Sequence, residues 1–555
     1  MKTVKKALAL LLTLTIVLSL SITAFAAGTK VVNVINNKGT TGVSIDGMTF
    51  TAYKIFDLIS NTGTDAATKY NYMINEAFGS LTFDGATGQA LEEKLATLAS
   101  DSAELQKFSK AVAEFAASNN VDAAKTEVTV SGETASFTDL EEGYYVIVGT
   151  AKVDGASADE ILAVSAIVDN ALDTPDDILL KVEAPKVTKT VAASQSNLGS
   201  NDHGTSADLG DVVEFTLTST VPSFYGFEKY QFAFKDTLSE NLKFRTDMMK
   251  AILGTGSILT VAMADSGADA DVYVDIQGQT MTVNFGDKDP EKTDLYNALP
   301  LLKDHAGETI TFSYFADVKA GASGTYEEFN DVYPVYSNDP DDWSKHTTPN
   351  VPHDKDYVYD FDLNILKQDE AEGHAALKGA QFALYRESGP AHEWYKESNG
   401  VIDWQRKSNL DERPSIGDDW VTIKETVEGG KLNSPFKGLP TGTYYLYEVK
   451  APDGYKPMEQ PVKVTITANS KENGQVDENS IKFTYENPNI TENKGTVEDE
   501  KANGAYTGTI PVFNTSGTKL PETGGMGTTI FYTVGAVMMA GALVLLITRK
   551  KMSVN

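Results

Sequence analysis

Short runs of apolar and β-branched residues, separated by turn residues, make up most of the chain between residues 27 and 515. Runs such as 212–217, 311–315 and 462–466 are rich in Val, Thr, Ile and Phe, and Gly, Asp, Asn or Pro bounds them. Many short strands in succession are typical of β-sandwiches. We therefore predict an all-β fold of sandwiches.

One segment near residues 88–120 has a helical period instead. Its apolar residues are spaced three or four positions apart and two asparagines end it, which predicts an amphipathic helix. The residues are Leu105, Phe108, Val112 and Phe115, followed by Asn119 and Asn120. We expect a small helical insertion packed on the first sandwich and assign no function to it.

Two Pro- and Asp-rich joints divide the chain. They lie at residues 173–177 and 337–356. Short joints of this kind suit a rod of stacked domains better than a compact cluster. The predicted domains are residues 27–180, 181–345 and 346–515.

The N-terminus has the pattern of a cleaved export signal. Three lysines in the first six residues precede an apolar run at 7–20, and Ala24, Phe25 and Ala26 form a small-x-small cleavage site. The run is short for a membrane span. We therefore expect residues 1–26 to be removed on secretion.

The C-terminal segment, residues 516–555, combines a pentapeptide, an apolar stretch at 530–548 and a basic end. The pentapeptide is Leu520, Pro521, Glu522, Thr523 and Gly524, and the basic residues are Arg549, Lys550 and Lys551. This order resembles the sorting signal of Gram-positive surface proteins, which a sortase cuts between Thr and Gly. The resemblance implies a transient membrane helix and attachment of Thr523 to an amine, which places the protein on the cell wall.

The first and third domains repeat the same sequence pattern. Residues 45–53 and 377–385 share the spacing of Gly, Phe and Tyr, and residues 137–149 and 436–448 share a second pattern. We interpret the two domains as copies of one fold. Superposed without gaps, the copies place Ile35 opposite Lys367 and Gly149 opposite Glu448.

A lysine and a glutamate on core strands need partners, because an unpaired buried charge is costly. The stretch 445–455, Y-L-Y-E-V-K-A-P-D-G-Y, resembles the E-box of CnaB-type domains in pilins and adhesins. The resemblance implies an isopeptide bond between Lys367 as nucleophile and Asn514 as acceptor, with Glu448 as acid/base. Asn487 is a weaker acceptor candidate, and the alternative is a buried ion pair. The first domain, CnaB-like but without this lysine and glutamate, is expected to form no such bond.

An apolar site suits this chemistry. Burial favours the neutral amine and the protonated acid, so the lysine becomes nucleophilic and the acid polarises the amide. The reaction happens once per molecule, so we do not expect the chain to be an enzyme with turnover.

Residues 185–191 open the second domain, residues 234–238 lie near its middle and residues 330–340 close it. This pattern is similar to that of the CnaA-like middle domain of backbone pilins. By that resemblance Lys189 is the nucleophile, Asp236 the acid/base and Asn330 the acceptor. Two alternatives stay open, since Asn338 is a second possible acceptor and Asp236 could instead cap a turn.

Polymerisation of such pilins needs a further lysine near the end of the first domain. Lys186 keeps the expected Pro-Lys pair but has Ala184 where the motif has Tyr, and Lys181 has the better distance from Lys189. We predict Lys181 or Lys186, against the alternative of solvated lysines at a joint.

Composition narrows the possible functions. The chain has no cysteine, which excludes disulfides and thiolate metal sites, and a net charge of −31, which argues against nucleic acid as a partner. The acidic loop 265–271 and six scattered histidines give no confident metal site, and no motif indicates a cofactor. Amide crosslinks would take the role of disulfides.

These resemblances imply a sortase-assembled backbone pilin of three tandem Ig-like β-sandwiches that supports adhesion and colonisation. Expected partners are pilin-specific and housekeeping sortases, further copies of the chain, minor pilins and peptidoglycan, with an unknown host ligand. The alternative is a monomeric wall-anchored adhesin with the same crosslinks. An enzyme carried on a stalk is disfavoured, because no catalytic cluster lies outside the crosslink trios.

Overall fold

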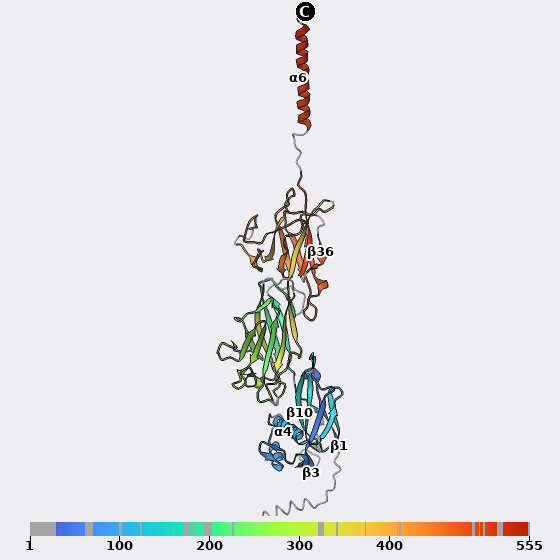
Figure 1. Ribbon diagram of the computed structural model, residues 1–555, viewed down its shortest axis with the longest axis vertical. Helices are drawn as coiled ribbons and strands as arrows, with labels where there is room; N and C mark the ends of the chain where they lie inside the picture. The colour runs from blue at the N-terminus through green and yellow to red at the C-terminus, as the bar shows by residue number, and fades with distance from the viewer. Residues whose placement is uncertain are drawn as a thin grey trace, which may run out of the picture.

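Three β domains follow one another along the long axis of the computed structural model, and a helix lies beyond the third (Figure 1). The structure describes residues 29–61, 70–98, 103–122, 125–158, 160–170, 177–180, 182, 184–193, 202–224, 227–319, 327–339, 342–371, 373–407, 409, 412–490, 494–498, 500–502, 505–518 and 526–552. The predicted all-β class and the rod of tandem domains are confirmed. The predicted signal peptide lies outside the described residues.

The first domain packs a three-stranded sheet, in the order β11-β1-β8, against a six-stranded sheet built around β10-β9-β3-β4. Its strands are β1 (Thr29–Ile35), β2 (Val43–Ser44), β3 (Thr49–Asn61), β4 (Tyr70–Ile74), β5 (Thr82–Phe83), β6 (Ala86–Thr87), β7 (Lys125–Thr129), β8 (Thr134–Glu141), β9 (Gly143–Val153), β10 (Ile161–Asp169) and β11 (Asp177–Leu179). Because β11 pairs in parallel with β1, the first and last strands of the domain lie side by side.

The predicted helical insertion is present. It consists of α3 (Gln89–Leu95) and α4 (Ala103–Asn119), preceded by the short helices α2 (Lys38–Thr41) and η1 (Glu76–Phe78). Phe108 and Val112 of α4 are fully buried against Ile55 and Phe78, in a core separate from that between the two sheets. The apolar stripe of α4 therefore covers the outer face of the larger sheet.

The middle domain is a sandwich of two large sheets, in the orders β12-β14-β24-β17-β18 and β13-β26-β25-β15-β21-β20-β19. Its strands are β12 (Val187–Ala193), β13 (Gly204–Ser206), β14 (Val212–Thr220), β15 (Phe232–Leu238), β16 (Leu242–Phe244), β17 (Lys250–Leu253), β18 (Ser257–Leu259), β19 (Val261–Met263), β20 (Val272–Gln277), β21 (Thr280–Phe285), β22 (Asp287–Lys288), β23 (Tyr296–Asn297), β24 (Thr309–Val318), β25 (Glu327–Tyr336) and β26 (Asp354–Tyr359). The short helices α5 (Leu299–Leu302) and η2 (Lys303–His305) precede β24.

The boundary predicted between residues 345 and 346 is too early. Strand β26 pairs antiparallel with β25, from Glu327 opposite Tyr359 to Val332 opposite Asp354. The Pro- and Asp-rich segment before β26 is therefore a loop within the middle domain, and this domain continues to Tyr359.

The C-terminal domain packs a four-stranded sheet, in the order β32-β27-β38-β37, against an eight-stranded sheet built around β28 and β33. Its strands are β27 (Phe361–Asp369), β28 (Gln381–Ser388), β29 (Ala391–Ser398), β30 (Val401–Gln405), β31 (Lys424–Glu425), β32 (Phe436–Leu439), β33 (Gly442–Lys450), β34 (Val462–Thr467), β35 (Lys482–Glu486), β36 (Lys494–Glu498), β37 (Glu500–Ala502) and β38 (Ala505–Asn514), with the short helix η3 (Glu478–Ser480). As in the first domain, the first and last strands, β27 and β38, pair in parallel.

Polar contacts connect the domains at both joints of the rod (Figure 1). At the upper joint, between the middle and C-terminal domains, Asp208 accepts hydrogen bonds from Arg386 at 2.8 Å and from the indole of Trp404 at 2.9 Å. At the lower joint, between the first and middle domains, the backbone nitrogen of Ser157 donates to the carbonyl of Asn350 at 2.7 Å. The loop before β26 thus also contacts the first domain.

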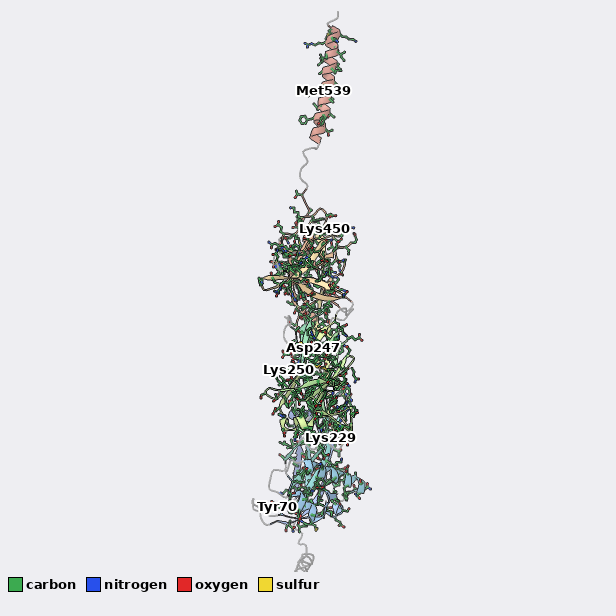
Figure 2. The ribbon with its side chains drawn as sticks, turned by 90° about the vertical axis from the view of Figure 1, so that its left-hand side faces the viewer. Tyr70, Lys229, Asp247, Lys250, Lys450 and Met539 are labelled. Atoms are coloured by element: carbon green, nitrogen blue, oxygen red, sulfur yellow. The ribbon has the colours of Figure 1, made fainter. Side chains whose placement is uncertain are left out.

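The helix α6 (Met526–Met552) ends the described chain. Within it, residues 529–552 are long and apolar enough to cross a membrane. Figure 2 shows this helix, marked by Met539, standing clear of the three domains. Its last turn carries the basic residues Arg549, Lys550 and Lys551, as the predicted membrane helix requires.

Candidate crosslinking sites

The C-terminal site joins the first and last strands of its domain. In the parallel pair β27–β38, Lys367 lies opposite Val512, and Asn514 ends β38 two residues later. Glu448 comes from β33 in the facing sheet. Alternate residues of each strand point into the core, and this alternation brings the three side chains together between the sheets.

The three side chains contact one another directly. Lys367 Nζ donates a hydrogen bond to Asn514 Oδ1 and lies 3.7 Å from Glu448 Oε1. Asn514 Nδ2 donates to Glu448 Oε2 at 3.1 Å and to the carbonyl of Lys456 at 2.8 Å. The carboxamide is therefore oriented from both ends, with its oxygen toward the amine and its nitrogen toward the acid.

The protein excludes water from this site. The exposed fractions of Lys367, Glu448 and Asn514 are 0%, 6% and 2%. Burial lowers the pKa of the Lys367 amine to about 8, although the nearby Glu448 opposes the shift. A substantial fraction of this amine is thus neutral near physiological pH, the form that can attack a carbonyl carbon.

The middle-domain site lies between the two sheets of its sandwich. Lys189 comes from β12 of one sheet, whereas Asp236 of β15 and Asn330 of β25 come from the other. Lys189 Nζ lies 2.8 Å from Asp236 Oδ2, and the exposed fraction of all three residues is 0%. Burial lowers the pKa of the Lys189 amine and raises the pKa of the Asp236 carboxyl, which favours the neutral pair.

Sequence reasoning missed Tyr314 in this site. The tyrosine lies on β24, and its hydroxyl donates to Asp236 Oδ1 at 3.0 Å and accepts a hydrogen bond from Asn330 Nδ2. In the sequence it is one aromatic residue in a strand pattern. The pairing of β24 with β14 and the packing of the two sheets together bring it next to the site.

The alternative assignments lie elsewhere in the structure. Asn338 follows β25 in a loop, where its backbone nitrogen donates to the carbonyl of Lys345 at 3.2 Å. Asn487 is buried after β35, and its carboxamide oxygen accepts from the backbone of Asn489 at 3.0 Å. Asp236 lies within β15 and does not cap a turn. The structure therefore brings Asn330 and Asn514, and not these alternatives, to the two acids.

The first domain has different residues at the matching positions. In both domains the first strand shifts its pairing register near its start. After the shift, Val32 pairs with Phe137 in the first domain, and Leu363 pairs with Phe436 in the C-terminal domain. When residues are counted from these two pairs, Asn36 of the first domain matches Lys367. The ungapped superposition, which gave Ile35, was wrong by one residue.

Neither position of the first domain supplies the chemistry of the C-terminal site. Asn36 is 4% exposed and donates to the carbonyl of Val43 at 2.7 Å and to Glu133 at 2.6 Å. At Gly149 an added Cβ would lie 2.6 Å from the ring of Phe50, so the aromatic ring occupies the space that a glutamate would need.

The candidate polymerisation residues are only partly described. Lys186 is exposed at the lower joint, where its carbonyl accepts a hydrogen bond from Ser219 at 2.6 Å. Lys181 and the pentapeptide 520–524 lie outside the described residues.

In the acidic loop 265–271, Asp271 accepts hydrogen bonds from both the backbone nitrogen and the hydroxyl of Thr260. In the part of the chain that the structure describes, no group of His, Cys, Asp and Glu could hold a metal ion.

Comparisons with known proteins identify two segments. Residues 361–480 match the SpaA prealbumin-like fold domain, and residues 514–553 match the LPXTG cell wall anchor motif. A comparison with curated proteins finds no match.

Solved structures of similar fold include three pilins. The T6 backbone pilin of Streptococcus pyogenes is 17% identical at a TM-score of 0.47, covering 88% of this chain and 99% of its own. The major pilin SpaD of Corynebacterium diphtheriae is 17% identical at 0.44, with 89% and 98% covered. The major pilin RrgB of Streptococcus pneumoniae is 14% identical at 0.40, with 86% and 94% covered.

The anchor motif and the apolar helix define a Gram-positive surface protein that is anchored to the cell wall. The predicted localisation is thus confirmed. The resemblance to a sortase-anchored pilin is confirmed in its SpaA-type C-terminal domain and its anchor.

Proposed function

We propose that the chain is the shaft subunit of a covalent cell-surface pilus. One observation carries the proposal: buried lysine, acid and asparagine side chains gather between the sheets of two successive domains, in a rod that leads to a wall anchor. Such sites would let the rod bear tension without disulfides, which the chain has no cysteine to form.

Each site would form one isopeptide bond. Lys367 would join Asn514 with Glu448 as acid/base, and Lys189 would join Asn330 with Asp236 as acid/base. Each bond releases one ammonia molecule and forms once, so the chain is a structural protein and not an enzyme with turnover. The seclusion of both sites and the lowered pKa of both amines support this chemistry.

Sortases would assemble the shaft. A pilin-specific sortase would cut after Thr523 and transfer this residue to Lys186 or Lys181 of the next subunit, and a housekeeping sortase would attach the base to peptidoglycan. The exposure of Lys186 at the joint supports its access to another subunit. Because Ala184 departs from the pilin motif, a monomeric wall-anchored adhesin with the same crosslinks is the second candidate.

Wall extracts distinguish the two candidates. For the pilin we expect ladders of high mass that resist boiling in SDS and disappear when Lys181 and Lys186 are both replaced by Ala. Replacement of Lys243, an exposed lysine of the middle domain, by Ala is the matched control and should leave the ladder intact. A single band of monomer mass in the wild type would instead establish the adhesin.

A further inference from the structure

The middle-domain site contains a hydroxyl between its acid and its acceptor. Tyr314 OH donates to Asp236 Oδ1 at 3.0 Å and accepts from Asn330 Nδ2, and the residue is fully buried. Its ring stacks on Phe215 with 5.6 Å between centroids. The packed ring holds the hydroxyl against both groups and away from water.

The C-terminal site has no need of such a hydroxyl. Glu448 accepts directly from Asn514 Nδ2 at 3.1 Å while its other oxygen lies 3.7 Å from Lys367 Nζ. Aspartate has one methylene less than glutamate. In the middle domain the shorter acid contacts Lys189, and Tyr314 completes the path to Asn330.

We propose that Tyr314 relays a proton from Asp236 to the departing carboxamide nitrogen of Asn330 while the Lys189–Asn330 bond forms. The inference rests on the proposed crosslink and adds a catalytic residue to it.

The proton balance of the step is closed. Asp236 begins as the neutral acid with its proton on Oδ1. The neutral amine of Lys189 attacks Cγ of Asn330, and one Nζ proton passes to Oδ2 of Asp236. Tyr314 gives its hydroxyl proton to Nδ2 and takes the proton from Oδ1 of Asp236. The Nζ–Cγ bond forms, the Cγ–Nδ2 bond breaks, and ammonia leaves with the proton from Tyr314. Tyr314 ends with its hydroxyl restored, and Asp236 ends as the neutral acid with its proton on Oδ2.

The surroundings suit a relay better than a charged intermediate. Burial raises the pKa of Tyr314 well above its usual value, so the hydroxyl keeps its proton until the leaving nitrogen takes it. Tyr336 offers a contrast in the same domain. It is equally buried, but its hydroxyl has no hydrogen-bond partner among the described residues.

The test follows crosslinking by intact-mass spectrometry of the full chain. All proteins carry Lys367→Ala, so that the middle domain is the one expected source of ammonia loss. Tyr314→Phe should slow bond formation by about 100-fold or more, the usual contribution of a proton-transfer group. The matched control Tyr336→Phe also removes one buried hydroxyl and should crosslink as fast as the parent. The double variant Asp236→Glu/Tyr314→Phe should regain the bond, because the longer acid reaches the carboxamide directly.

Each outcome decides the matter. Slow crosslinking with Tyr314→Phe that Asp236→Glu rescues supports the relay. Crosslinking of Tyr314→Phe at the parental rate overturns the relay. The relay is also overturned if the double variant Asp236→Glu/Tyr314→Phe forms no crosslink or does not fold, since Tyr314 then has a structural role. A parent protein that loses no ammonia would instead contradict the proposed crosslink itself.

Discussion

The middle and C-terminal domains place the same three kinds of residue, a lysine, an acid and an asparagine, in different geometries. In the C-terminal domain Lys367 and Asn514 lie on neighbouring parallel strands of one sheet, and the acid comes from the facing sheet. In the middle domain the lysine faces its acid and asparagine across the sandwich. A bond at the first site would join two adjacent strands, whereas a bond at the second would join two sheets.

This difference shows which features the chemistry requires. Both sites are dry, and in both burial lowers the pKa of the amine. Neither the strand that carries the acid nor the length of its side chain is fixed, because a hydroxyl can extend the reach of an aspartate. The two sites therefore share seclusion from water and a chain of contacts that links the amine, the acid and the carboxamide.

The largest expected effect on the comparison comes from removing each lysine. A crosslink over a loop of more than 100 residues stabilises a domain by about 5 kcal/mol in the chain-entropy treatment used for disulfides. Lys189→Met and Lys367→Met keep the apolar stem and remove the amine. We expect each to lower the free energy of unfolding of its own domain by about that amount, measured by urea denaturation.

Variants at the other end of each bond provide the control. Asn330→Ala and Asn514→Ala remove the same bonds while leaving the lysines in place. Above about pH 10.5, where a buried lysine amine is neutral in both the folded and the unfolded state, they should cause losses of a size similar to those of the lysine variants. If neither the lysine variant nor its asparagine partner changes the unfolding of the domain, the domain holds no crosslink.

A smaller effect is a pH dependence that appears only when the C-terminal bond is absent. In Asn514→Ala, Lys367 stays a free amine with a pKa of about 8 when folded, against the ordinary lysine pKa of 10.5 in the unfolded chain. Between these pH values the unfolded state binds more protons, so stability rises with pH, by about 3 kcal/mol in total. In the wild type the same nitrogen would be an amide and would not titrate.

The matched control for this experiment is Asn514→Ala/Lys367→Met. Denaturation curves of both variants between about pH 8 and 10.5 separate Lys367 from every other titrating group. If the free energies of unfolding of the two variants change in parallel with pH over this range, burial does not lower the pKa of the Lys367 amine.

The sequence predicted the C-terminal site better than the middle one, for a physical reason. The E-box at 445–455 is a local pattern, so it points to Glu448 directly and to Lys367 through the repeated fold. Tyr314 reaches its site through strand pairing, and its alternating strand context is the same as that of any core aromatic residue. A contact of this kind carries no local signal.

The path of the loop before β26 and the strand irregularities could likewise not be predicted from the sequence. The segment 337–356 has the prolines and aspartates of a linker, yet the chain returns from it to pair β26 with β25. The register shift between Lys30 and Val32 also occurs between Phe361 and Leu363. The ungapped superposition was based on residues 45–53 and 377–385, and it therefore placed the first strands one residue out of alignment. Composition indicates where the chain turns and does not show which strand it pairs with next.

The smallest expected effect is mechanical and separates the two geometries. A Lys367–Asn514 bond would connect the strands by which the chain enters and leaves the C-terminal domain, so little of this domain could extend under tension. A Lys189–Asn330 bond would leave residues 331–359, including β26, outside the closed loop. We expect single-molecule pulling to release a step of up to about 100 Å from the middle domain, at about 3.5 Å per residue, and about 500 Å from the first domain, where we expect no bond. In Lys189→Met the middle step should lengthen to about 600 Å. If the wild type lacks the 100 Å step, the pairing of β26 with β25 withstands the load and the two geometries are mechanically equivalent.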